Sequence, residues 1–146
     1  MFDENKQLSS KNRLINCSWS FSQLNNAVAF LVREAGLYSG MLDIENPPII
    51  EGTEISEIVT QWLDATVEPH GIEAEPVSTS YDKINHMISS SPPALIMLPD
   101  DSEARFLAVL KGNKNYIRVI TPEYKTVSIS VKSLRDILVG QIEAPF

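Results

Sequence analysis

The apolar residues of this chain change their spacing at Pro92-Pro93, and this change limits the possible folds more than any other feature. Before the two prolines, apolar residues recur every three or four positions, which is the period of an amphipathic helix. After them come short segments rich in β-branched and aromatic residues, separated by turn residues, which is typical of strands. Helices followed by a run of strands indicate an α+β domain.

Three helices are expected before the prolines. The first ends at Gly36, because glycine readily takes the positive φ of a helix end. The second begins near Thr53 and ends at Pro69-His70-Gly71. Residues 72–77 alternate apolar and acidic side chains and predict a half-buried strand, and a third helix follows from a capping-box pattern at 79–82. The apolar residues expected to face the core are Phe21, Leu24, Val28, Leu31, Ala35, Ile55, Ile58, Val59, Trp62, Leu63, Ile84, Met87 and Ile88.

Four strands are expected after the prolines. Their ranges are 94–98, 106–110, 116–121 and 127–131, with hairpin loops at 100–102 and 112–115. A last helix at 133–138 leads through Gly140 to a closing strand at 141–144. The expected architecture is therefore a set of N-terminal helices packed on an antiparallel sheet. The polar residues 1–13 are expected to form a flexible leader, and 14–146 a single domain.

Charge and composition exclude several functions. The net charge of −7, with the basic residues scattered along the sequence, argues against nucleic acid and anionic membrane surfaces as partners. The single cysteine, Cys17, rules out an internal disulfide and fits a reducing compartment. Together with His70 and His86 it cannot form a zinc site without several carboxylates. The acidic cluster Asp100-Asp101-Glu103 lacks the glycine and spacing of a calcium loop, so no metal and no cofactor are expected.

The order of segments in residues 91–144 matches a known domain. A Pro-Ala pair and an apolar strand precede an acidic loop, then come a strand opened by Arg105-Phe106, a hairpin, a Thr-Pro turn, a strand, a Ser-x-x-x-Leu helix and a segment led by Gly140. This order resembles the bacteriocin-processing cysteine peptidase domain at the N-terminus of peptide-exporting ABC transporters. The resemblance covers residues 17–144 and implies a papain-like cysteine peptidase fold.

The resemblance also implies where the catalytic residues of that family would fall. The family has a catalytic cysteine at the start of the first helix, a histidine at the start of a central strand, and an aspartate before proline after the next strand. The matching positions here are Gln23, Arg105 and Thr121. Cys17, six residues before Gln23, falls where the family has its oxyanion-hole glutamine. All four are therefore vestigial catalytic positions.

These replacements remove the chemistry of a cysteine peptidase. Such an enzyme needs a thiolate, an imidazole that moves the proton, and a group that orients the ring. The amide of Gln23 is not a nucleophile, and the guanidinium of Arg105 stays protonated and cannot act as a base. Loss of nucleophile and base together costs about a million-fold in turnover in a comparable serine triad. The sequence predicts that this domain is not an enzyme.

Exporters similar to the haemolysin type I secretion system carry such a degenerate domain. The resemblance therefore implies binding without cleavage: the domain would hold unfolded or partly unfolded protein cargo before translocation. Its partners would be the exported cargo and the membrane and ATPase domains of the transporter. It would lie as a soluble domain on the cytoplasmic side of the bacterial inner membrane. Two surfaces are candidates for cargo binding. One is the cleft near Gln23, Arg105 and Thr121, and the other is an apolar patch elsewhere.

Two alternatives stand beside this interpretation. The domain could be a structural or regulatory module that docks on the ATPase or membrane part of the transporter. It could also be an active cysteine peptidase that uses Cys17, because the sequence from Cys17 to Ser22 is similar to the start of the catalytic helix in papain-like enzymes. His70 and His86 fall in or beside helices, where surface histidines are the expected interpretation.

Overall fold

A computed structural model describes residues 12–40, 42–74, 83–90, 92–98 and 104–143, with side chains as far as Leu138. Residues 12–17 form a short helix that precedes the labelled elements. In chain order these are β1 (Trp19–Ser20), η1 (Phe21–Gln23), α2 (Leu24–Glu34), α3 (Ile55–Val67), η2 (Glu68–His70), α4 (Ile84–Ser90), β2 (Ala94–Leu98), β3 (Arg105–Gly112), β4 (Tyr116–Ile120), β5 (Thr126–Ser130) and α5 (Val131–Glu143). The fold is α+β, as the spacing of the apolar residues predicts.

One antiparallel sheet of five strands forms the middle layer, with β3 at its centre. β2 pairs along one edge of β3, from Arg105 to Val109. The opposite edge is shared by two strands, because β1 pairs with Arg105 and Phe106 while β4 pairs from Ala108 onward. β5 then pairs with β4. The end of β4 therefore lies next to β1.

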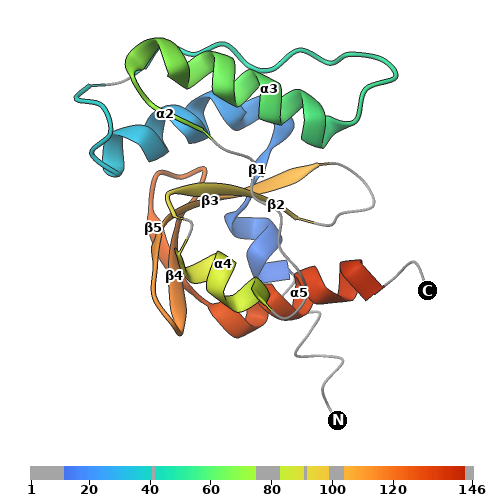
Figure 1. Cartoon of the computed structure of the whole chain (residues 1–146). Helices are drawn as coiled ribbons and strands as arrows, with labels where there is room; N and C mark the ends of the chain where they lie inside the picture. Colours follow the sequence, from blue (N-terminus) through green and yellow to red (C-terminus); the bar gives the residue numbers. More distant parts are fainter. Residues whose placement is uncertain (1–11, 41, 75–82, 91, 99–103, 144–146) are drawn as a thin grey trace.

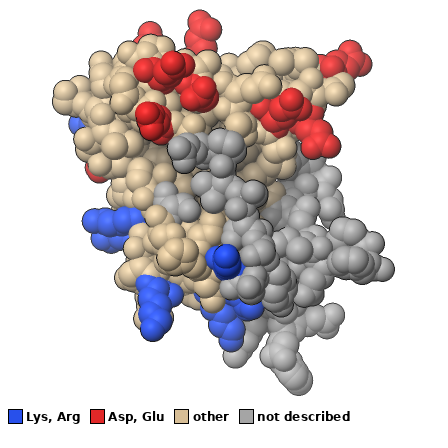
Figure 2. Space-filling model, viewed as in Figure 1, with Lys and Arg blue, Asp and Glu red and all other residues tan. Residues whose placement is uncertain are grey.

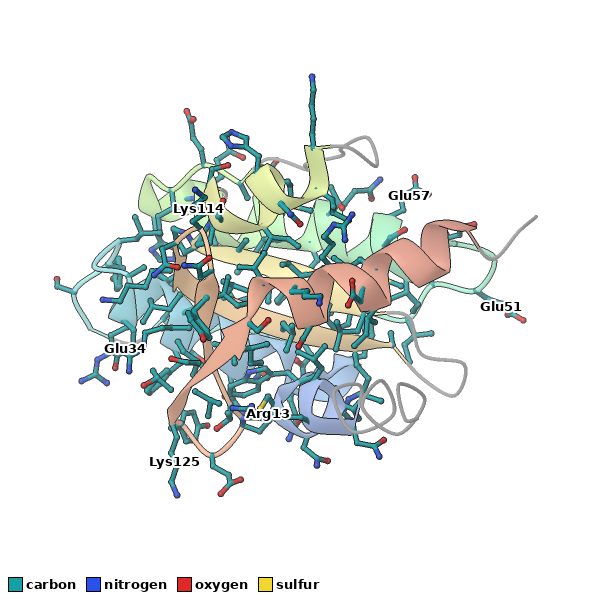
Figure 3. All side chains as sticks on the ribbon, turned by 90° about the horizontal axis from the view of Figure 1, so that it is seen from below. Arg13, Glu34, Glu51, Glu57, Lys114 and Lys125 are labelled. Carbon is teal, nitrogen blue, oxygen red and sulfur yellow. The ribbon has the colours of Figure 1, made fainter. Side chains whose placement is uncertain are left out.

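The chain crosses from one side of this sheet to the other at β1 (Figure 1). Helix 12–17, α4 and α5 lie on the lower side, and Figure 3 shows α4 and α5 running across this face. Their apolar residues form one core with the strand residues that point downward. The buried members of this core are Leu14, Cys17, Ile84, Ile88, Leu98, Leu107, Val109, Ile117, Val119, Ile129, Val131 and Leu134. Burial of such a surface is the main stabilising contribution to the fold.

Helices α2 and α3 cover the upper side of the sheet (Figure 1). Ala27 and Leu31 of α2 pack with Trp19, Ala108 and Ile120 in one cluster. Further clusters join Leu24 and Val59 to Phe106, and Val28 and Val32 to Leu42 and Val67. The apolar stripes predicted for both helices therefore face inward.

The C-terminal end of α2 has a Schellman motif at the predicted glycine. Gly36 has a φ of 76°. Its N–H donates to the Arg33 carbonyl at 3.1 Å, and the Leu37 N–H donates to the Val32 carbonyl at 3.0 Å. These two bonds satisfy carbonyls that the helix itself leaves without partners. Gly71, with a φ of 77°, follows η2 in the same conformation.

Most of the predicted strands are confirmed to within one or two residues. β2 has the predicted bounds, and β3, β4 and β5 overlap the predicted ranges. Two predictions are wrong. The closing strand at 141–144 does not form, since residues 141–143 continue α5. Residues 72–74 are not in a strand, and the rest of the 72–77 segment lies outside the described residues.

Other predictions fall partly outside the described residues. These include the capping box at 79–82, the loop at 100–102 and residues 1–11 of the predicted leader. Asn12 and Arg13, the last residues of that leader, already belong to the first helix. Within the described ranges, no helix combines the length and hydropathy needed to cross a bilayer.

Candidate functional site

Arg105, which the sequence resemblance matches to the histidine of the peptidases, is bound to the turn that precedes β1. Its Nε donates to the Ser18 hydroxyl at 2.8 Å. Its Nη2 donates to the backbone carbonyls of Ser18 at 2.9 Å and Ile15 at 3.2 Å. These carbonyls lie at the C-terminal end of helix 12–17, where the helix dipole favours a cation. The guanidinium therefore holds this helix to the start of β3.

Gln23, which the sequence resemblance matches to the catalytic cysteine, caps the start of the first long helix. Its Oε1 accepts hydrogen bonds from the backbone N–H and the hydroxyl of Ser20, both at 3.1 Å. A side-chain oxygen three residues into a helix that accepts from the N-cap N–H is half of a capping box. Ser20 in turn pairs with Arg105 across the sheet. The two vestigial positions thus contact the same short strand.

Thr121, which the sequence resemblance matches to the catalytic aspartate, closes the turn between β4 and β5. Its N–H donates to the Lys125 carbonyl at 2.8 Å, and its carbonyl accepts from the Tyr124 N–H at 2.8 Å. Its Oγ1 accepts from the N–H groups of Glu123 at 3.3 Å and Lys125 at 3.4 Å. This hydroxyl therefore satisfies backbone donors of its own turn and has a local structural role.

Trp19 connects this turn to β1. Its Nε1 donates to the Ile120 carbonyl at 2.7 Å, and the residue is buried. Its ring meets that of Tyr124 edge-on with centroids 6.0 Å apart. Trp19 therefore joins the two strands that share one edge of β3, and it brings Thr121 close to the segment that carries Cys17 and Gln23.

Cys17 is the last residue of helix 12–17 and is 8% exposed. Burial raises the pKa of its thiol above the ordinary value of 9.0, the Arg13 guanidinium opposes this, and the Glu123 carboxylate adds to it. At neutral pH the thiol is therefore protonated, which is the unreactive form. The position of Cys17 at the C-terminal end of its helix is also the opposite of the N-terminal position that stabilises a thiolate.

Among the described residues, neither histidine forms a hydrogen bond with Cys17. His70 is exposed in η2, on the upper side, where its ring packs against Tyr38 at 5.2 Å. His86 is exposed in α4, and its carbonyl accepts from the Ser89 and Ser90 hydroxyls. In the part of the chain that the structure describes, no three His, Cys, Asp or Glu residues gather as they would around a metal ion.

The structure thus brings the four vestigial positions to one region around β1, and each side chain there is buried or makes hydrogen bonds with nearby residues. Gln23 and Arg105 meet the two sides of the Ser18–Ser20 segment. Thr121 is tied to the same segment through Ile120 and Trp19. Every buried polar side-chain atom of the described residues has a hydrogen-bond partner. The chemistry of this region is that of helix capping and turn closure.

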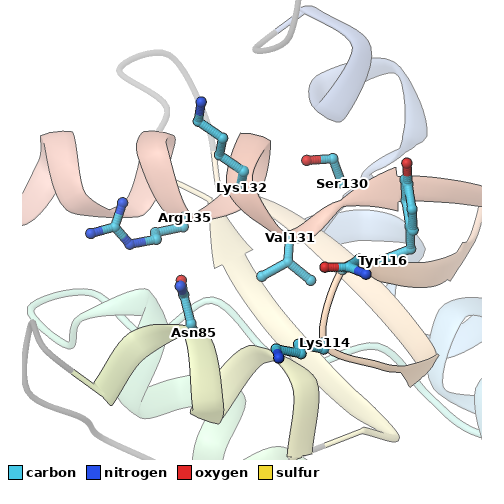
Figure 4. Close-up of a pocket in the computed structure, with 8 residues that line it drawn as sticks. Asn85, Lys114, Tyr116, Ser130, Val131, Lys132 and Arg135 are labelled. Carbon is cyan, nitrogen blue, oxygen red and sulfur yellow. The ribbon is translucent and has the colours of Figure 1, made fainter.

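Two shallow hollows lie at the opposite end of the sheet, around Tyr116. One, of about 560 Å³, lies where α4, the β3–β4 hairpin and the start of α5 meet (Figure 4). The other, of about 320 Å³, lies on the upper sheet face beside Arg118. Gly112 lies seven positions after Arg105 along β3, which is about 23 Å of strand. The hollows are therefore distinct from the region of the vestigial positions.

The residues of these hollows were not singled out by the sequence, because they are far apart along the chain. Tyr116 lines both hollows and is 56% exposed. Among the described residues that line them, five are Lys or Arg and none is Asp or Glu. These five are Lys111, Lys114, Arg118, Lys132 and Arg135. A sequence with scattered basic residues thus folds with a basic surface at one end of its sheet.

Charge is segregated between the layers. Residues 34–73, which include α3 and the segment that joins α2 to it, contain nine Asp and Glu residues and no Lys or Arg. Figure 2 shows the acidic side chains over this layer and the basic side chains over the lower part of the same view. The net charge of −7 is therefore a sum over an acidic upper surface and a more basic lower one.

Comparison of the chain with protein-family models, with curated proteins and with solved structures finds no match in any of the three.

Proposed function

We propose that this chain is a non-catalytic, papain-like peptidase domain of a type I secretion ABC exporter, and that it binds unfolded or partly unfolded protein cargo before translocation. The proposal rests on the resemblance of the sequence to the bacteriocin-processing peptidases. The observation that carries its non-catalytic part is the contact of Arg105 with Ser18 and Ile15. A residue at the position of the catalytic base acts here as a structural cation.

The arrangement around β1 supports the papain-like part of the proposal. The first long helix starts at Gln23 next to the strand pair of Ser20 and Arg105. The helix start and the head of the central strand are therefore neighbours, as a nucleophile and its base must be. The turn at Thr121 lies at the end of the adjoining strand β4. The three positions that the resemblance selects from distant segments thus meet in one region.

The environment of Cys17 argues against the active-peptidase alternative. Its thiol is buried and its pKa is raised. A nucleophilic cysteine needs access to substrate and a lowered pKa. Incubation of the chain with a peptide that carries a double-glycine leader tests this directly. We expect no cleavage, and cleavage that disappears in Cys17→Ala would establish the enzyme instead.

Cargo binding itself does not require high affinity. A domain tethered beside a transport channel meets its cargo at an effective concentration of about millimolar when the linker is short. Weak binding to an open, polar surface would therefore suffice. The two hollows around Tyr116 provide such a surface in the described residues.

The binding proposal is tested by following backbone amide shifts of the chain during a titration with an unfolded polypeptide. The same polypeptide in its folded form is the matched control. We expect a localised set of amides to move with the unfolded form and not with the folded form. If no amide moves at about millimolar polypeptide, cargo binding is wrong and a docking role in the transporter becomes the better explanation.

The exporter part of the proposal has a separate test in the gene. We expect the reading frame beyond Phe146 to continue into apolar membrane spans and a Walker-type ATPase. A stop codon directly after Phe146 would contradict the link to a transporter and leave the binding proposal standing.

A further inference from the structure

One half of the upper sheet face is not covered by α2 and α3. Side chains on β4 and β5 alternate between the two faces, and those that point down are buried in the lower core. Those that point up change character along the strands. Ile120 is buried under α2, whereas Arg118 and Tyr116 of the same strand are exposed. The sheet therefore presents a bare surface at the end occupied by the β3–β4 hairpin.

The register of the strands makes this surface basic. Lys111 lies opposite Arg118, Arg118 lies opposite Ser128, and Tyr116 lies opposite Ser130. Residues directly opposite each other share a face, so Lys111 and Arg118 are neighbours on the bare half. A β-bulge between Val109 and Lys111 sets this register. Together with Lys114 and Lys132 around the adjoining hollow, they form what we call the Tyr116 surface.

The described acidic residues do little to neutralise the Tyr116 surface. Among the described residues, the ion pair at this surface joins Arg135 to Asp136 at 3.6 Å, with side chains that are 32% and 43% exposed. Pairs this exposed contribute little. The carbonyl of Ser128 accepts from Arg13 Nη2 at 3.0 Å, which occupies part of the outer edge of β5. A partner that added a strand at this edge would have to displace Arg13, so the side chains of the surface are the more accessible contacts.

We propose that the Tyr116 surface binds an extended acidic segment of a polypeptide. Carboxylates at alternate positions of an extended chain would meet Lys111, Arg118 and Lys132, and the exposed Tyr116 ring would pack against the backbone between them. The acidic residues of 34–73, which Figure 2 shows over the upper part of the molecule, would repel a longer polyanion such as nucleic acid, which favours a short acidic segment. This inference rests on the proposed function, because it names the surface and the charge of the bound cargo.

The test uses three labelled peptides of about twelve residues, long enough when extended to cross the sheet. They alternate Gly and Ser with Asp, with Asn or with Lys. Anisotropy and amide shifts of the full chain are measured at low and at high salt. We expect the Asp peptide to bind most tightly, to move amides in residues 111–118 and 128–135, and to dissociate as salt screens the charges. The Asn peptide is the matched control for backbone binding.

Variants locate the contact. A triple variant, with Lys111→Gln, Arg118→Gln and Lys132→Gln, should bind the Asp peptide about tenfold or more weakly. Each exposed charge contributes a factor of roughly three to the affinity. Arg33→Gln with Lys125→Gln removes exposed cations elsewhere and should leave the affinity unchanged. Tyr116→Ala should reduce the affinity for the Asp and Asn peptides equally, because the ring would contact the peptide backbone. All three variants alter exposed side chains, and an unchanged amide spectrum outside the surface confirms their fold.

Several results would overturn the inference. Equal binding of the Asp and Asn peptides, or shifts confined to the region of Gln23 and Arg105, would refute the acidic surface while cargo binding stands. Tighter binding of single-stranded DNA of equal charge would make the surface one for nucleic acid. Self-association that moves the same amides and is lost in the triple variant would make the acidic partner a second copy of the chain. If none of the peptides nor the unfolded polypeptide binds, both proposals fail.

Discussion

The guanidinium of Arg105 lies against Ser18, and donates from Nε to its hydroxyl at 2.8 Å and from Nη2 to its backbone carbonyl at 2.9 Å. Ser18 is fully buried and follows helix 12–17 directly, while Arg105 opens the central strand. The two residues are 87 positions apart in the sequence. This contact fixes the first helix to the sheet and fills the place where the resemblance would put an imidazole.

Arg105→Ala should therefore destabilise the fold. It removes hydrogen bonds from a charged donor and leaves carbonyls of Ser18 and Ile15 without that partner, a loss of about 2–3 kcal/mol in the free energy of unfolding. Urea denaturation measures this loss. Arg118→Ala is the control, because Arg118 is exposed on β4, and should change stability by less than about 0.5 kcal/mol. Equal effects of the two substitutions would contradict the structural role of Arg105.

Trp19→Phe tests the junction of β1 and β4. The substitution keeps an aromatic ring but deletes the Nε1 bond to the buried Ile120 carbonyl, at an expected cost of about 1–2 kcal/mol. Trp62→Phe is a matched control, since Trp62 Nε1 also donates to a backbone carbonyl, that of Glu45, at an exposed site. Water can replace that bond, so the control should cost less. A larger loss for Trp62→Phe in the same denaturation experiment would refute the assignment.

The thiol of Cys17 should make stability depend on alkaline pH. Its pKa is raised in the folded chain, so the unfolded chain releases the proton first as the pH rises. The stabilising contribution is complete below the ordinary thiol pKa of 9.0 and is lost as the pH rises through the raised folded value. The denaturation midpoint should therefore fall more between neutral and alkaline pH in the wild type than in Cys17→Ala. Parallel curves for the two proteins would show that burial does not shift this thiol.

Gly36→Ala should weaken the C-terminal end of α2. A side chain at a φ of 76° clashes with its own backbone, although no other atom lies within 4 Å of the added Cβ. The cost is about 1 kcal/mol in the free energy of unfolding. Gly36→Asn is the control, since asparagine tolerates the left-handed region better, and should cost less. If alanine and asparagine are equally tolerated, the positive φ does not limit this position.

The local elements follow from the sequence because their signals are local. The helical stripes of α2 and α3 and the strand-forming segments of β2 to β5 depend on the spacing of apolar residues, which a sequence displays directly. Gly36 also ends its helix for a local reason, because glycine readily takes a positive φ. The positions Gln23, Arg105 and Thr121 could also be selected from the sequence, and the structure places all three around β1.

The errors fall where the signal is weak or is not local. A two-residue strand such as β1 has no period of its own and exists only because Trp19 and Ser20 pair with β3. The strand expected at 141–144 after Gly140 does not form, because the apolar residues Leu134, Ile137 and Leu138 of α5 pack on the sheet at helical spacing and the helix continues past them. Tertiary packing decided the secondary structure there.

The sequence by itself determined the α+β class and the alternation of buried residues, because both depend on residue identity and near neighbours. The tertiary structure alone decided that Arg105 is a structural cation and that Lys111, Arg118 and Lys132 line two hollows that share Tyr116. Strand register and helix packing bring these residues together from distant segments. The electrostatic potential of a surface depends on distances in space, and the order of residues does not contain those distances.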